Sequence, residues 1–225
     1  MKSLTVRALG GFGVRLFFMG YGVFGPAHTW AYWQGWLFVA TYGLSESLII
    51  GWLRRHDPAL LERRLKGGVA AEKRPAQKVV MALVSFGFGL MLVIPSLDHR
   101  LHWSHVPAAF SLLAAAALLV GQWVIYRTFR ENTFAAIVVD VIPGQRVIAT
   151  GPYARVRHPM YSGVFLGYLA FPVLLGSWWG LLGSAVLGAV FIARIFDEEK
   201  LLRQSLPGYE EYCRKVPWRL VPRGW

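Results

Sequence analysis

The feature that most constrains this chain is a series of long apolar stretches, at 8–25, 30–53, 78–97, 106–128, 160–176 and 178–196. Each is close to the roughly 17–25 residues that cross a bilayer as a helix, although Arg15 interrupts the first. Charged residues make up only 16% of the 225 residues, whereas a soluble domain carries about 25%. The sequence therefore predicts an all-α integral membrane protein with five or six transmembrane helices.

Lysine and arginine lie almost entirely on one side of these spans. Six spans place both termini on that side, together with the basic loops 54–78 and 127–157. The links on the opposite side, 26–29, 98–105 and 176–177, contain one such residue, Arg100. Because cytoplasmic loops are the basic ones, we expect cytoplasmic termini, in the inner membrane of a bacterium or the endoplasmic reticulum of a eukaryote. The net charge of +12 then reflects topology and attraction to membrane lipids, and no nucleic-acid partner is expected.

The last two stretches are separated only by Gly176 and Ser177, which predicts a C-terminal helical hairpin. Small residues recur at four-residue spacing in both arms, as expected where membrane helices pack closely: Gly163 and Gly167, then Gly180, Ser184 and Gly188. We divide the chain into N-terminal helices with a basic loop, 1–77, and a core with the hairpin and tail, 78–225.

The segment 151–163, GPYARVRHPMYSG, is too polar and too patterned for a simple spanning helix. Pro159 predicts a helix start, whose free N–H groups favour a carboxylate or phosphate. Arg157 would reinforce that preference, His158 can donate or accept hydrogen bonds, and Tyr161 adds a ring and a hydroxyl. The alternative is a basic anchor at the membrane surface with an ordinary helix start.

Other polar residues lie at the same membrane boundary. Glu198 and Glu199 could hold an amino group, although helix pairs such as Arg194 with Glu198 are the simpler interpretation. Glu46 lies inside a span, where it could form an ion pair with Arg15 or contact a substrate.

Asn132 follows the fourth span, where it could be a ligand-binding residue or a helix cap. The tail 209–220 mixes aromatic and basic residues, which fits a surface anchor or a segment folded back over the site. Cys213 is the single cysteine, so a disulfide within the chain is excluded. His102 and His105 lack carboxylate or cysteine neighbours in sequence, and no metal site is assigned.

Three motifs together, GPYARVRHPMYSG, RIFDEEKLL and YEEYCRKVPWRLVP, resemble the isoprenylcysteine carboxyl methyltransferase family, within a wider group that includes phospholipid N-methyltransferases. The resemblance covers roughly residues 130–222. It implies S-adenosylmethionine as methyl donor, bound on the cytoplasmic side, with S-adenosylhomocysteine as product. The residues expected to bind the donor are Gly151, Pro152, Tyr153, His158, Pro159, Tyr161, Glu198 and Glu199. The candidate catalytic residues are Arg157, Glu46, Asn132 and Lys215, of which Lys215 is the nearest match to a basic family residue.

The expected function is therefore methyl transfer to a lipophilic acceptor that enters from the bilayer. The resemblance favours a prenylated-cysteine-type carboxylate as that acceptor. A phospholipid amine and a small thiol remain open, as does the oligomeric state. An NADPH-dependent membrane reductase and a small membrane transporter are the alternatives from other functional classes.

Overall fold

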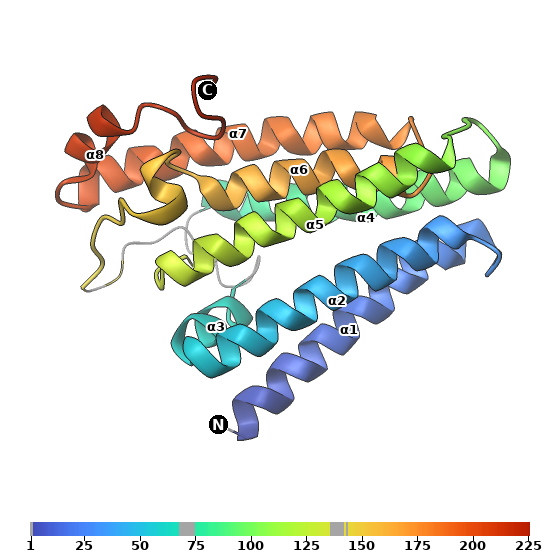
Figure 1. The fold of residues 1–225 in the computed structure, drawn as a ribbon, viewed down its shortest axis with the longest axis horizontal. Helices are drawn as coiled ribbons and strands as arrows, with labels where there is room; N and C mark the ends of the chain where they lie inside the picture. The colour runs from blue at the N-terminus through green and yellow to red at the C-terminus, as the bar shows by residue number, and fades with distance from the viewer. Residues whose placement is uncertain (1, 68–74, 136–141, 143) are drawn as a thin grey trace.

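The computed structural model of the protein describes residues 2–67, 75–135, 142 and 144–225 (Figure 1). Its elements in chain order are α1 (Lys2–Ala27), α2 (Trp33–His56), α3 (Pro58–Leu65), α4 (Pro75–Leu101), α5 (Ala108–Glu131), the short 3-10 helix η2 (Gly151–Ala154), α6 (Pro159–Leu174), α7 (Gly180–Ser205) and α8 (Tyr209–Lys215). Within the described residues every regular element is helical, which confirms the predicted fold class.

Five helices are long and apolar enough to cross a membrane, namely α1, α2, α4, α5 and α7. The sixth predicted span, α6, is apolar but has 16 residues, about 24 Å of helix against roughly 30 Å of hydrocarbon. Its length is set at both ends. Pro159 occupies the first turn, where its missing N–H costs nothing, and Gly176 turns the chain beyond the last residue with φ of +79°.

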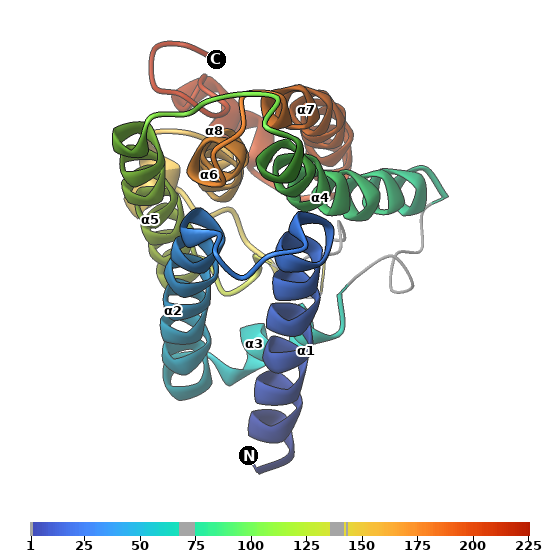
Figure 2. The same cartoon turned by 90° about the vertical axis from the view of Figure 1, so that its right-hand side faces the viewer.

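The short helix α6 lies at the centre of the bundle, with α5 and α7 beside it and α2 and α4 nearby (Figure 2). Its last residue, Leu174, is fully buried, as is Ile195 on α7. On α1 and α5, large apolar side chains such as Phe17 and Leu113 point outward, as expected for surfaces that face lipid. The two termini lie at the same end of the bundle (Figure 1), which fits the six spans predicted from sequence. The membrane side of that end, and a division of the chain after residue 77, stay predictions.

The backbones of α5 and α6 approach each other closely. A Cβ atom on Gly163 would lie 2.5 Å from the carbonyl oxygen of Gly121, so these positions bring the two backbones into contact. The expected hairpin packing is present on the other side of α6, where Ser184 Oγ donates to the carbonyl of Tyr168 at 2.6 Å. Gly163 therefore packs against α5 rather than against the second arm of the hairpin.

At the end of the bundle opposite the termini, Asp98 ties two loops together. This buried carboxylate accepts hydrogen bonds from Ser104 N at 2.7 Å, from Ser104 Oγ at 2.6 Å, and from Ser177 Oγ. Ser177 belongs to the α6–α7 link, so this contact fixes the hairpin to the loop that follows α4.

Two segments expected as loop or tail contain helices. The basic loop 54–78 includes α3. Residues 68–74 of this loop lie outside the described part of the chain, as do residues 136–141 and 143 of the loop 127–157. The tail contains α8. In addition, α7 runs to Ser205, nine residues beyond the predicted end of the span at 196. Hydropathy locates the lipid-crossing part of a helix, whereas the helix itself continues through the charged residues 197–200.

Candidate functional site

The segment that leads into α6 is held in place by the C-terminal tail. The backbone N–H of Arg157 donates to the carbonyl of Trp218 at 2.9 Å, and that of His158 donates to the carbonyl of Arg219 at 2.9 Å. These hydrogen bonds satisfy backbone groups just before the helix begins at Pro159. The tail thus folds back onto the GPYARVRHP segment, which agrees with one of the two interpretations drawn from sequence.

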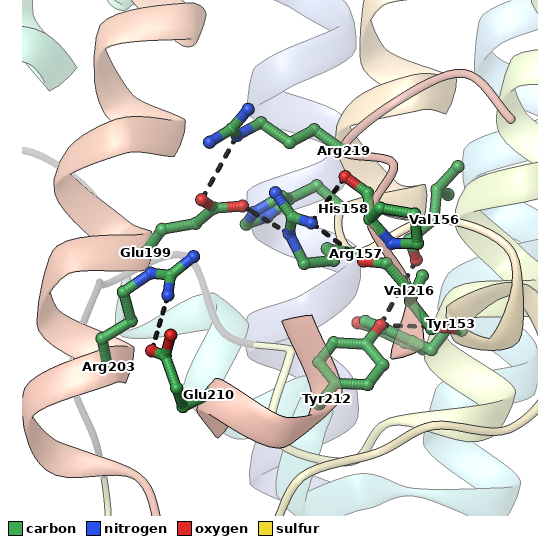
Figure 3. Close-up of polar contacts among 11 residues, drawn as sticks. Tyr153, Val156, Arg157, His158, Glu199, Arg203, Glu210, Tyr212, Val216 and Arg219 are labelled. Carbon is green, nitrogen blue, oxygen red and sulfur yellow. Dashed lines mark hydrogen bonds and ion pairs between the residues drawn. The ribbon is translucent and has the colours of Figure 1, made fainter. Parts of the chain in front are cut away.

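Glu199 is the centre of a buried ion cluster (Figure 3). Its Oε1 lies 2.7 Å from Arg157 Nε and 3.2 Å from His158 Nε2, while Oε2 lies 3.2 Å from Arg219 Nε. Arg157 also donates to the carbonyl of Val216 at 2.8 Å. Glu199 is 3% exposed, and both of its carboxylate oxygens are engaged by side chains of the protein itself. This arrangement joins α7, the start of α6 and the tail.

Glu198, one residue earlier, has a different environment. Its Oε2 accepts a hydrogen bond of 2.6 Å from the hydroxyl of Tyr161, which itself accepts one of 3.0 Å from Arg194 Nε. Arg194 also donates to Gln77 Oε1 at 3.1 Å, which fixes its guanidinium. Among the described residues Tyr161 is the hydrogen-bond partner of Glu198. The other carboxylate oxygen, Oε1, is therefore available to a ligand.

Glu198 lines an open pocket between α5, η2, α6, α7 and α8, which we call the polar pocket. Its polar side chains include Asn132, Arg146, Tyr153, His158 and Glu198, and its apolar side is formed by residues such as Leu201, Leu206 and Tyr209. A carboxylate, a guanidinium and aromatic rings thus converge on one space. Such a pocket can hold a zwitterionic ligand with an aromatic part.

The wall formed by η2 depends on specific hydrogen bonds. Asn132 Nδ2 donates to the hydroxyl of Tyr153 at 2.8 Å, and Tyr212 Oη donates to the Tyr153 carbonyl at 2.8 Å. Burial raises the pKa of the Tyr153 hydroxyl, so it stays protonated at neutral pH. Gly151 has φ of +56°, and a Cβ atom there would lie 2.5 Å from Glu131 Cγ. Glycine is therefore required at the start of this turn.

The structure brings most of the predicted residues together, but not all of them. The polar pocket is lined by six of the predicted residues: Asn132, Tyr153, Arg157, His158, Tyr161 and Glu198. Its walls are shaped from η2 and α6 by Gly151, Pro152 and Pro159. Lys215 is exposed and pairs with Glu211 at 2.7 Å, away from the pocket lining. Glu46 pairs with Arg15 at 3.0 Å, as one interpretation predicted, in a second cavity. The functional roles assigned to all these residues stay predictions.

Some residues of the site were not assigned from sequence. Arg194 is buried beside Tyr161. Its position within an apolar span could have indicated a functional residue, because an arginine at membrane depth is rare without a polar partner. Nothing in the sequence marked Gln77 or Arg146. Gln77 reaches the site through the packing of α4 against α7, where it contacts Arg194. Arg146 reaches the pocket through the loop before η2.

The pocket lies within and beside the part of the chain that matches a known family. Residues 110–207 match the model of the phospholipid methyltransferase family. The protein-S-isoprenylcysteine O-methyltransferase of Schizosaccharomyces pombe is 42% identical over 89 residues, which is 38% of this chain and 38% of that protein.

Two further relatives carry names that point to other functions. The mouse delta(14)-sterol reductase TM7SF2 is 28% identical over 177 residues, 63% of this chain and 40% of the reductase. The nickel-cobalt-cadmium resistance protein NccN of Alcaligenes xylosoxydans xylosoxydans is 27% identical over 109 residues, 47% of this chain and 50% of that protein. The chain thus spans half or less of the length of each of these relatives. For the part of the chain that they cover, the similarities confirm the predicted resemblance to the membrane methyltransferase group.

Proposed function

We propose that the protein is an S-adenosylmethionine-dependent membrane methyltransferase that acts on a lipophilic acceptor. The observation that carries this proposal is Glu198, which lines the polar pocket within the matched region and uses only one carboxylate oxygen, Oε2, in its hydrogen bond with Tyr161 among the described residues. A carboxylate at this place suits the amino group of the donor. Glu199 is excluded from that role in our proposal because two arginines and the ring of His158 already surround it.

The remaining parts of the donor have suitable partners in the same pocket. Arg146 can meet its carboxylate, and the rings of Tyr153, Tyr209 and Tyr212 can pack against its adenine. When bound, S-adenosylmethionine supplies a methyl group on a positively charged sulfur, which keeps the electron pair of the broken bond. The task of the protein is to position the two reactants and exclude water, which needs neither a metal nor a covalent nucleophile of its own.

We propose a prenylated-cysteine-type carboxylate as acceptor, supported by the similarity to the S. pombe enzyme. The polar pocket is lined in part by α8. This helix lies at the end of the bundle that bears both termini and α3 (Figure 1), which we place on the cytoplasmic side. The donor would then enter from the cytoplasm and the acceptor from the bilayer.

The test of donor binding is calorimetric titration of the purified protein with S-adenosylhomocysteine. We expect Glu198→Gln to weaken binding by at least about tenfold, because a charge-assisted hydrogen bond contributes about 1.5–3 kcal/mol. Glu210→Gln is the matched control, since Glu210 lies in the exposed tail and pairs with Arg203 at 2.6 Å. Wild-type protein that binds no S-adenosylhomocysteine would overturn the proposal. Equal affinity of Glu198→Gln and wild type would refute the role of Glu198.

A reductase is the second candidate, because the similarity to the sterol reductase extends over 63% of the chain. NADPH titration in parallel with S-adenosylhomocysteine distinguishes the two. Binding of NADPH without binding of S-adenosylhomocysteine would select the reductase.

A further inference from the structure

A second cavity, of about 260 Å³, lies between α2, α3, α5 and α6 and also touches α1 and α4. Most of its lining is apolar, including Ile50, Leu118 and Phe171. We call it the apolar cavity. Its α1–α3 side comes from residues before 110 and therefore lies outside the segment that matches the phospholipid methyltransferase family.

The charges in the apolar cavity do not balance. Arg15 and Glu46 form an ion pair at 3.0 Å, which leaves Arg64 as an additional cation in the lining. The contacts found for the Arg64 guanidinium are the carbonyl of Ala135 at 3.1 Å, Met160 Sδ at 3.9 Å and the face of the Phe129 ring at 4.3 Å from its centroid. None of these groups carries a negative charge.

A half-buried arginine is costly, since burial disfavours the charged form. Glu46 is the carboxylate that acts on Arg64 electrostatically, but it is already paired with Arg15, so one carboxylate serves two guanidinium groups. The same burial lowers the pKa of Arg64, although an arginine stays protonated at neutral pH. A ligand anion beside the guanidinium would offset this cost. In addition, Gln122 Nε2 is buried in the same lining and has no hydrogen-bond partner among the described residues. Two donors of different kinds thus point to an acceptor group that comes from outside the chain.

Arg64 also lies where the two spaces meet. Its contacts Met160 and Ala135 line the polar pocket, whereas Arg64 itself lines the apolar cavity. A group held by the guanidinium would therefore be next to the place proposed for the methyl donor.

We propose that the apolar cavity binds the hydrocarbon chain of an amphiphile with a single carboxylate head, and that Arg64 holds this carboxylate at the boundary with the polar pocket. This inference rests on the proposed function and names residues that select the acceptor. An amine head is disfavoured, because its ammonium would face the net positive charge that Arg15 and Arg64 leave beside the single carboxylate of Glu46. Methylation forms an O–CH3 bond on the carboxylate while the S–CH3 bond of the donor breaks and its electron pair stays on the sulfur of S-adenosylhomocysteine. The product is a neutral ester, which no longer pairs with the guanidinium and leaves more readily.

The test compares three ligands with the same farnesyl chain on protein in nanodiscs: N-acetyl-S-farnesylcysteine, its methyl ester, and S-farnesylcysteamine. We expect the acid to bind at least about tenfold more tightly than the ester or the amine. In Arg64→Gln the affinity for the acid should fall to that for the ester. Arg55→Gln, the same change at an exposed arginine that lines neither space, should keep the preference.

S-adenosylhomocysteine titration of each variant shows whether it is folded and separates the two proposals. If this compound binds but wild type does not prefer the acid, or Arg64→Gln keeps the preference, the inference fails and the proposed function stands. If the acid preference depends on Arg64 but S-adenosylhomocysteine does not bind, the anion site stands and the proposed function fails. Should Arg64→Gln not fold, Arg64→Lys replaces it, with a reduced acid preference expected because lysine lacks the two-pronged guanidinium contact.

Discussion

Replacing Gly163 with alanine should force α5 and α6 apart. The new Cβ atom would lie 2.5 Å from the carbonyl oxygen of Gly121 and 2.8 Å from Ile125 Cγ1. Non-bonded heavy atoms pack best at roughly 3.5–4.0 Å, so the two helices must separate by about 1 Å. The carbonyl belongs to the backbone of α5 and cannot move aside as a flexible side chain could.

Gly167, one turn further along α6, provides the matched control. An added Cβ atom there would meet Leu118 and Phe171 at 3.8 Å, which is ordinary van der Waals contact. Both substitutions gain the same helix propensity, about 1 kcal/mol in soluble helices, so this gain cancels between them. The difference that remains is the cost of overpacking, about 1–3 kcal/mol. At about 2–4 °C per kcal/mol, Gly163→Ala should unfold about 2–12 °C below Gly167→Ala.

Thermal unfolding in detergent, followed by the loss of monodisperse protein on a sizing column, measures this difference. Because Gly163 also lines the apolar cavity, separation of the helices should change acceptor binding as well. Equal midpoints for the two alanine variants would refute the argument that backbone contact between α5 and α6 sets the geometry of this region.

Three other perturbations test separate parts of the structure. Glu199→Gln should destabilise the protein by about 3 kcal/mol, because Arg157 and Arg219 lose their buried carboxylate. An unchanged unfolding midpoint would contradict this. Asp98→Ala leaves two Ser104 donors and the Ser177 hydroxyl unpaired, which should lower the free energy of unfolding by about 3 kcal/mol. The affinity for S-adenosylhomocysteine should persist, because the polar pocket lies at the other end of the bundle. Burial raises the pKa of the Cys213 thiol, so less thiolate is present at pH 8 in the native protein than in the unfolded protein. Iodoacetamide should therefore label the native protein more slowly, and its labelling rate should increase as the pH rises. Equal rates for native and unfolded protein would show that the thiol is accessible and that its pKa is not shifted.

The sequence alone predicted the membrane class, the approximate spans, the hairpin and the segment that begins α6. These features depend on local or linear properties. Runs of apolar residues are required by the thickness of the bilayer. Pro159 fits the first turn of a helix, where its missing N–H is not needed, and two residues between spans allow only a tight turn. The Arg15–Glu46 pair could also be anticipated, because an ionisable group at membrane depth needs a partner.

The tertiary structure decided which carboxylate faces the pocket. Glu198 and Glu199 are consecutive in α7, so their side chains diverge by about 100° around the helix axis. The rotation of α7 against α6 directs Glu198 to Tyr161 and Glu199 to Arg157. No sequence pattern contains that rotation, since it follows from the packing of whole helices.

The same reason applies to the contacts between distant segments. Gly163 belongs by spacing to a hairpin motif, yet it meets Gly121 of α5 because α6 is surrounded on several sides. Arg64 is one of eight basic residues in the predicted loop 54–78, and only the fold places it beside Met160 at the junction of two pockets. Hydrophobicity determines where a chain enters the membrane, whereas side-chain packing between helices determines which polar groups share a site.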